Sequence, residues 1–245
     1  MNKQRFIIIL AGGIGVRFGS SLGKQYTEIG GRPIIVWTIE KYLRLFSIEH
    51  IIVVINESHL LLWKGLTNDY EHLRPIQTVV GGEQRFHSVK NALNHISCAG
   101  DDLIGVHDGV RPFVSTATIK NAYATADVHG SGVPVFDSVN TLRIKQGSKN
   151  NAIDRATIKE VQNPQVFKSA ILKKAYQQPY EPLFLDDATI VEADGNNIHL
   201  SRGNYENIKI THPQDIYIAE GLLPLYHTDL NVDGGLDKNE RHKAL

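Results

Sequence analysis

The feature that most constrains the fold of this chain is a regular alternation of short aliphatic runs with longer amphipathic segments. The pattern predicts strands at residues 6–10, 51–55, 76–80, 103–107 and 132–136, and helices at 34–46, 60–70, 86–96 and 116–128. Strands that are almost entirely aliphatic are typical of parallel sheets with both faces buried. The sequence therefore predicts an α/β fold in which helices cover both faces of a mostly parallel sheet.

The alternation breaks between residues 137 and 168, where polar residues and the loop KQGSKNN replace any long helix. We predict an extended arm or β-hairpin that leaves the main body here. The remaining pattern predicts helices at 170–176 and 186–193, strands at 198–201 and 208–210, and a final helix at 213–222. Residues 228–245 have almost no apolar periodicity, so we expect a flexible tail. We interpret the chain as one domain over residues 1–227, with an arm at 137–168, followed by this tail.

Composition excludes several classes of function. The 26 basic and 26 acidic side chains balance, so no overall field attracts nucleic acid or a membrane surface, and any anion site must be local. The single cysteine, Cys98, excludes an intramolecular disulfide and a multi-cysteine metal site. No apolar run approaches the roughly 18 residues that span a bilayer. We expect a cytoplasmic protein with no nucleic-acid or membrane partner.

A glycine-rich stretch, LAGGIGVRFGSSLGKQY, occupies residues 10–26 directly after the first predicted strand. A dinucleotide-binding G-x-G-x-x-G pattern fails, because three residues separate Gly15 from Gly19. A P-loop also fails, because only three residues separate Gly19 from Gly23 and Gln25 stands where the magnesium-binding hydroxyl belongs. The stretch still places glycines at the carboxyl end of a strand, where parallel sheets bind ligands.

Two cations, Arg17 and Lys24, belong to the same stretch. The planar fork of arginine and the compact charge of lysine together suit the spread charge of a triphosphate. A glycine turn with two solvated cations is the alternative that the residues leave open.

Further motifs follow in order along the chain. They are GGEQRFHSV at 81–89, VHDGVRP at 106–112, AIDR at 152–155, VQNPQVF at 161–167 and NIKITHPQDI at 207–216. Together with LAGGIGVRFG and GKQY, they resemble the 2-C-methyl-D-erythritol 4-phosphate cytidylyltransferase family over about residues 5–222. The resemblance implies a Rossmann-like nucleotidyltransferase fold and an enzyme in which a polyol phosphate attacks the α-phosphorus of CTP and pyrophosphate leaves, a step of isoprenoid precursor synthesis.

The resemblance also implies a nucleotide site with Mg²⁺ as cofactor. Arg17 and Lys24 would contact the triphosphate as catalytic residues, and Asp108 would hold the metal ion, since magnesium binds through one or two carboxylates plus substrate phosphates. The nucleotide-binding positions that match the family motifs are Ala11, Gly12, Gly13, Gly15, Gly82, Arg85, Ser88 and Asp108.

A second group of matching residues would bind the polyol phosphate. Arg155 and Lys209 match catalytic positions that grip its phosphate, Asp108 and Arg111 match positions beside it, and Thr141 resembles an arm threonine that contacts the polyol, with Ser138 as the alternative. Because Arg155 lies in the predicted arm, we expect it to enter the site of a neighbouring subunit in a homodimer.

Several of these residues have plainer interpretations. Asp108 could be a cap or a partner of Arg111, and Ser88 could be the cap of the helix that it opens. His107 is expected to be a buried hydrogen-bonding residue rather than a ligand. The other histidines lack the spacing of a zinc site.

Two departures from the family pattern concern the substrate. Gly23 replaces the proline of PKQ, and Asn163 replaces the threonine of QTPQ. Ribitol 5-phosphate cytidylyltransferase, which shares the glycine loop, HD.VRPF and NIKIT, is therefore the alternative within the same fold, and another polyol phosphate is also open. A nucleotide-binding regulator without turnover is a further alternative, although the matched cations for a second substrate argue against it.

Overall fold

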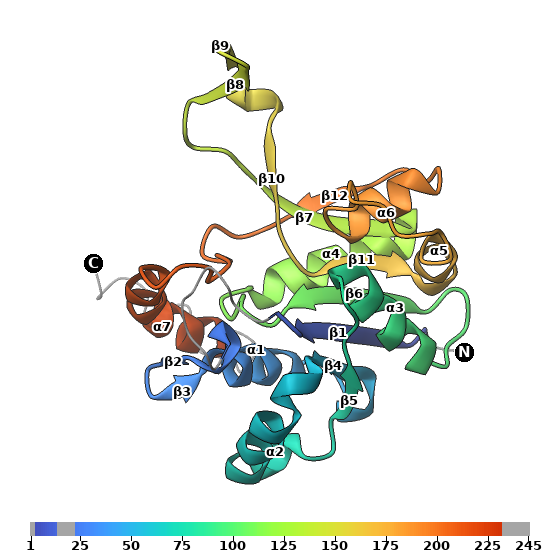
Figure 1. Cartoon of the computed structure of the whole chain (residues 1–245), viewed down its shortest axis with the longest axis vertical. Helices are drawn as coiled ribbons and strands as arrows, with labels where there is room; N and C mark the ends of the chain where they lie inside the picture. The colour runs from blue at the N-terminus through green and yellow to red at the C-terminus, as the bar shows by residue number, and fades with distance from the viewer. Residues whose placement is uncertain (1–2, 14–22, 232–245) are drawn as a thin grey trace.

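A central sheet organises the computed structural model, which describes residues 3–13 and 23–231. Eight strands of the described chain form this sheet, in the order β10-β7-β11-β6-β1-β4-β5 with β12 beside β7 (Figure 1). Their bounds are β1 Arg5–Ala11, β4 Ile51–Ile55, β5 Gln77–Val80, β6 Leu103–Asp108, β7 Ser131–Asp137, β10 Lys159–Val161, β11 Gln165–Lys168 and β12 Leu200–Arg202. A two-stranded ribbon, β2 Glu28–Ile29 with β3 Arg32–Pro33, lies outside it.

The middle of the sheet is parallel, as predicted. β1 pairs in parallel with β4 and β6, and β4 pairs in parallel with β5. The register places Leu10 opposite Asp108, so the glycine-rich stretch and the HDG motif leave the sheet at the same edge. That edge, beyond the carboxyl ends of the strands, is where such sheets bind ligands.

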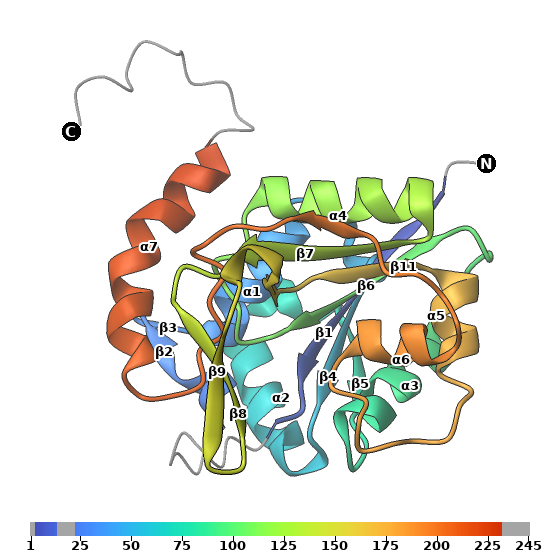
Figure 2. The same ribbon diagram turned by 90° about the horizontal axis from the view of Figure 1, so that it is seen from above.

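Helices cover both faces, which confirms the predicted α/β architecture (Figure 2). Their bounds are α1 Ile34–Leu43, α2 Leu60–Asp69, α3 Arg85–His95, α4 Thr116–His129, α5 Ser169–Ala175, α6 Asp187–Ala193 and α7 Asp215–Asn231. Alternate residues of β1 point to opposite layers: Ile7 and Ile9 pack with α1, α2 and α4, whereas Phe6 and Ile8 pack with α3, α5 and α6. No helix in the described ranges is long and apolar enough to cross a membrane.

The arm is shorter than its predicted bounds of 137–168. A hairpin of β8 Leu142–Gln146 and β9 Lys149–Ile153 projects from the body (Figure 1). Residues 159–168 instead return to the sheet, because β10 pairs with β7 and β11 lies between β7 and β6, antiparallel to both. Val166 and Phe167 of β11 are fully buried, so packing in the core fixes this segment as an inner strand.

The C-terminal predictions need two corrections. Residues 208–210 do not form a strand; Ile210 donates one backbone hydrogen bond to the Val110 carbonyl at 3.0 Å. The last helix, α7, begins at Asp215 and continues through Asn231, so residues 228–231, assigned to the tail, are helical. The rest of the predicted tail, 232–245, lies outside the described residues.

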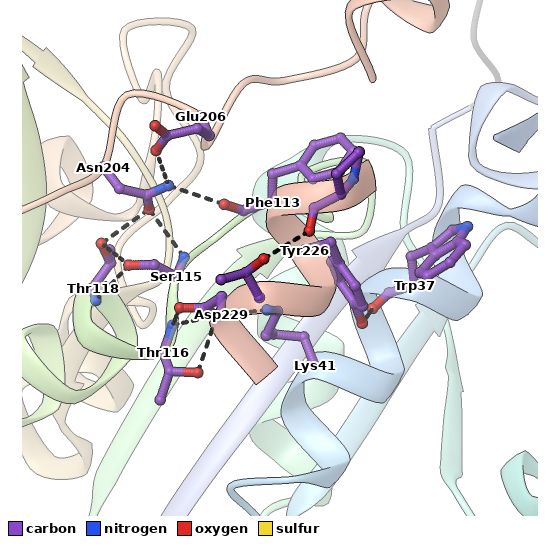
Figure 3. A network of polar contacts seen from close by, with 12 residues as sticks. Trp37, Lys41, Phe113, Ser115, Thr116, Thr118, Asn204, Glu206, Tyr226 and Asp229 are labelled. Carbon is purple, nitrogen blue, oxygen red and sulfur yellow. Dashed lines mark hydrogen bonds and ion pairs between the residues drawn. The ribbon is translucent and has the colours of Figure 1, made fainter. Parts of the chain in front are cut away.

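A buried polar cluster, here called the α7 clamp, explains why the last helix extends so far (Figure 3). The Lys41 side chain is only 1% exposed, and its ammonium donates to Asp229 Oδ2 at 2.7 Å and lies 4.2 Å from the centre of the Tyr226 ring. Asp229 Oδ2 also accepts from the Thr116 backbone N–H at 3.1 Å, and the Tyr226 hydroxyl donates to the Trp37 carbonyl at 2.8 Å. Burial lowers the pKa of Lys41, and the hydrogen bond that the ammonium donates to Asp229 opposes that shift, so the ammonium depends on α7 for its counterion.

Candidate active site

A cavity of about 340 Å³ opens beyond the carboxyl ends of the four parallel strands β1, β4, β5 and β6. The last residues of β1 and β6 and the residues that follow all four strands line it, together with the start of α3. The lining residues are Leu10, Ala11, Gly12, Gly13, Lys24, Gln25, Asn56, Gly82, Glu83, Gln84, Arg85, Ser88, Asp108, Val110 and Lys209.

Most of the residues predicted for the nucleotide site meet in this cavity, together with Lys209, which was predicted to bind the second substrate. The structure brings together Ala11, Gly12, Gly13, Lys24, Gly82, Arg85, Ser88, Asp108 and Lys209, which come from five separate motifs. Gly15 and Arg17 lie outside the described residues. Arg111, Thr141 and Arg155 do not line the cavity.

Two cavity residues that sequence reasoning missed hold the start of the glycine-rich stretch. The buried side chain of Gln25 donates from Nε2 to the Ala11 carbonyl at 2.7 Å, and Asn56 donates from Nδ2 to the Gly12 carbonyl at 3.3 Å. Asn56 follows directly after β4, so a polar residue at the carboxyl end of a parallel strand was the signal that could have found it.

Gly23 departs from the family pattern for a structural reason. Its φ angle is +76°, a left-handed conformation, whereas the proline of PKQ would fix φ near −65°. A Cβ at this position would also approach His59 Cε1 to 2.9 Å. The backbone conformation of this chain just before Lys24 is therefore one that proline cannot adopt.

The second glycine turn is joined to the start of α3. The Gly82 backbone N–H donates to Ser88 Oγ at 3.1 Å, and a Cβ at Gly82 would lie 2.4 Å from His87 Cβ, so only glycine fits. The N-cap of α3 is Gln84 and the helix begins at Arg85, so the alternative interpretation of Ser88 as the cap was wrong. Ser88 instead folds the glycine turn onto the first turns of the helix, where backbone amides attract polar ligands.

Asp108 lies at the centre of the charges in the cavity. Its Oδ2 is 2.8 Å from Lys209 Nζ and 3.4 Å from Arg111 Nε. Burial raises the pKa of Asp108, but the positive charges of Lys209, Arg85 and Arg111 outweigh it and hold the pKa well below its usual range. Asp108 is thus an ionised carboxylate that pairs with Arg111, as the plainer interpretation expected, and more closely with Lys209.

The neighbouring His107 has the buried, hydrogen-bonding role that the sequence predicted. The side chain is fully buried and its Nε2 lies 3.0 Å from the Arg111 carbonyl. Burial lowers the pKa of His107 to about 4, so the ring is neutral at pH 7. The described residues contain no group of three histidine, cysteine or acidic side chains placed to hold a metal ion.

Of the residues predicted for the second substrate, Asp108 and Lys209 line the cavity, whereas Arg155 and Thr141 lie apart from it. Arg155, on the short 3-10 helix Arg155–Thr157, is exposed and donates from Nη1 to the Val139 carbonyl at 3.0 Å. Thr141 is exposed just before the hairpin, whereas Ser138 is buried and its hydroxyl has no partner within the described ranges. Asn163 is also buried, and its carbonyl accepts from Asn207 Nδ2 at 2.7 Å.

The fold has clear relatives among solved structures. A crystal structure from Anaerococcus prevotii, described as 4-diphosphocytidyl-2C-methyl-D-erythritol synthase, superposes with a TM-score of 0.77 at 25% identity and covers 91% of this chain and 96% of its own. The sheet and the cavity at its carboxyl edge therefore define an enzyme of the nucleotidyltransferase class.

Sequence comparison then identifies the family. A profile of the 2-C-methyl-D-erythritol 4-phosphate cytidylyltransferase family matches residues 6–224, and the chain belongs to this family. The chain is 44% identical to 2-C-methyl-D-erythritol 4-phosphate cytidylyltransferase of Phocaeicola vulgatus over 220 residues, which is 90% of this chain and 100% of the relative. It is 43% identical to the same enzyme of Bacteroides thetaiotaomicron with the same coverage.

Proposed function

We propose that this chain transfers CMP from CTP to 2-C-methyl-D-erythritol 4-phosphate and releases pyrophosphate. The observation that carries the proposal is the convergence of family-matched residues from five motifs on one cavity at the carboxyl edge of the sheet. Membership of the family supports the choice of both substrates.

The proposed chemistry needs charge stabilisation rather than a general base. A phosphate oxygen of the polyol phosphate forms a bond to the α-phosphorus of CTP, and the bond from that phosphorus to the bridging oxygen of pyrophosphate breaks. A phosphate dianion is already nucleophilic at neutral pH, so positioning and cations carry the catalysis. Lys24 and Lys209 supply cations within the cavity, and Asp108 holds the Lys209 ammonium in place at 2.8 Å.

The residues present also fit a magnesium ion. Two carboxylates, Asp108 and Glu83, line the cavity, and the low pKa of Asp108 keeps it ionised. Mg²⁺ usually takes one or two carboxylates and completes its shell with substrate phosphates and water, so no larger protein cluster is required. When bound, the ion would neutralise triphosphate charge; Asp108 is the residue that we propose holds it.

The placement of Arg155 supports a homodimer. Thr141 directly precedes the hairpin that projects from the body, and Arg155 follows it closely (Figure 1). Neither residue lines the cavity of its own chain. We infer that the arm, with Arg155 and Thr141, completes the site of a second copy; Ser138, the alternative to Thr141, is buried within its own chain. We also infer a cytoplasmic location, because the balanced charge gives no attraction to a membrane surface.

The function can be tested with purified protein, CTP, 2-C-methyl-D-erythritol 4-phosphate and Mg²⁺. We expect one equivalent of pyrophosphate for each cytidine diphosphate-linked polyol detected by mass spectrometry, and far slower turnover when UTP replaces CTP. CTP binding without product, for any polyol phosphate supplied, would indicate a nucleotide-binding regulator instead.

A further inference from the structure

Asp187 is a charged residue with no exposed surface. It is the first residue of α6, which packs against the sheet with α3 and α5, and it is 0% exposed. A buried carboxylate is costly unless both of its oxygens find partners. The partners of Asp187 therefore indicate why the chain keeps a charge at this point of the core.

Both carboxylate oxygens are hydrogen-bonded to residues distant in sequence. Oδ1 accepts from the Tyr176 hydroxyl at 2.6 Å, and Oδ2 accepts from Arg85 Nη2 at 2.5 Å. Tyr176 belongs to the core beneath α3, whereas Arg85 is the residue of the pair that reaches the cavity. Asp187 thus connects the core to the site through one ion pair.

Arg85 has the geometry of a tethered ligand-binding group. Its side chain is 31% exposed and lines the cavity beside Ser88 and Asp108. A guanidinium has five N–H donors in a rigid plane, and Asp187 accepts from one amino group. Within the described ranges, no other hydrogen bond of the Arg85 guanidinium is found, so its remaining donors can serve a ligand in the cavity.

The carboxylate itself is held by the central sheet. Gln165 of β11 donates from Nε2 to Asp186 Oδ2 at 2.8 Å, and its Oε1 accepts from the Ala188 backbone N–H at 2.9 Å. These two hydrogen bonds hold Asp186 and Ala188, the residues on either side of Asp187. Strand β11 therefore fixes the position of the Asp187 carboxylate, and this carboxylate in turn holds the Nη2 group of the Arg85 guanidinium.

We propose that Asp187 is a positioning residue of the nucleotide site, which holds the Arg85 guanidinium in one orientation so that its remaining N–H groups bind acceptor atoms of CTP. The proposal rests on the proposed function only in taking CTP as the occupant of the cavity. Asp187 does not touch the nucleotide; its effect passes through Arg85.

The test is Asp187→Asn in the full chain, with CTP varied at saturating polyol phosphate. We expect the KM for CTP to rise about tenfold with kcat changed less than about threefold, because binding rather than the chemical step loses a contact. Tyr176→Phe is the matched control, since it removes the other hydrogen bond of Asp187 and leaves the Arg85 pair. Its KM should equal that of the wild type.

A double-mutant cycle separates positioning from a general loss of structure. Arg85→Gln should raise the KM for CTP, and Arg85→Gln/Asp187→Asn should raise it no further, because both changes remove the same interaction. Effects that multiply, or a wild-type KM in Asp187→Asn, would overturn the proposal. Should Asp187→Asn fail to fold, a wild-type KM in both Arg85→Lys and Arg85→Gln would overturn it equally.

Titration calorimetry with CTP alone keeps this test independent of the reaction. A wild type that binds CTP without turnover would contradict the proposed function, yet weaker binding by Asp187→Asn than by Tyr176→Phe would still support positioning. An active wild type with equal CTP affinity in the two variants would overturn the positioning role alone.

Discussion

Lys24 follows the turn at Gly23 and lines the cavity, and Lys209 lines it beside Asp108. Such cations act where charge develops, so removing one commonly costs about a hundredfold in rate. We predict that Lys24→Ala lowers kcat/KM by about a hundredfold and keeps the fold, as measured by pyrophosphate release and chemical unfolding. Lys174→Ala is the control, because Lys174 is 71% exposed and lies outside the cavity. Near wild-type turnover in Lys24→Ala would contradict the assignment.

Asp108 should also affect stability as a function of pH. Its pKa lies below the ordinary value of 3.8, because nearby cations outweigh burial. The unfolded chain then binds more protons in acid, so the carboxylate contributes stability above about pH 5 and loses it as pH falls toward the folded-state pKa. We predict that, below about pH 5, the free energy of unfolding falls more steeply with acid for the wild type than for Asp108→Asn. Asp69→Asn, which removes a carboxylate from the exposed surface of α2 away from the cavity, is the control.

At the scale of elements, the α7 clamp makes the last helix part of the fold. Removing Asp229 leaves the buried Lys41 ammonium without its counterion, and breaking a buried pair in this way costs on the order of 3 kcal/mol. We predict such a loss for Asp229→Asn in urea unfolding. Thr228→Ala should change stability by less than about 0.5 kcal/mol, because the exposed Thr228 hydroxyl bonds only within its helix.

The same clamp predicts a recovery. Lys41→Met/Asp229→Leu removes both charges, and apolar replacement of a buried pair is often neutral. The double variant should therefore be more stable than Asp229→Asn. An Asp229→Asn protein as stable as the wild type would show that α7 does not depend on this pair.

The elements differ in how far the sequence could predict them. The parallel strands and their helices were predictable because each is long and strongly periodic. The inner strand β11 was not, since it belongs to VQNPQVF, whose buried polar side chains Gln162, Asn163 and Gln165 resemble those of an exposed arm until their distant partners are known. For residues 208–210 the sequence predicted a strand that the structure lacks. Their alternating pattern suits a strand, but this segment is irregular and places Lys209 next to Asp108.

Sequence reasoning had the same limit at the candidate site. Residues at or just after the end of a parallel strand, such as Asp108 and Gly12, could be placed because the strand ends share one edge. The pairing of Arg85 with Asp187 spans 102 positions, and no local pattern signals it. Hydrogen bonds between distant segments therefore account for most of what the sequence could not show.

At the scale of the whole molecule, the arm predicts complementation between two inactive variants. If Arg155 serves the partner's cavity, a heterodimer of Lys24→Ala and Arg155→Ala contains one site with both residues intact. Random mixing makes about half of the dimers mixed, so we predict about a quarter of wild-type activity from two nearly inactive proteins. Kinetics after denaturation and joint refolding would measure it. No recovery, or a fully active monomer in analytical ultracentrifugation, would contradict an arm that acts between subunits.

The proposed function depends most on the identity of the polyol phosphate, because Asn163 departs from the family pattern and the arm is proposed to contact this substrate. The most direct measurement is pyrophosphate release with CTP and Mg²⁺, comparing 2-C-methyl-D-erythritol 4-phosphate with D-ribitol 5-phosphate under the same conditions. We predict turnover with the methylerythritol substrate and little with the ribitol substrate. Turnover with D-ribitol 5-phosphate alone would contradict the proposed function and assign the enzyme to the synthesis of polyol-containing polymers.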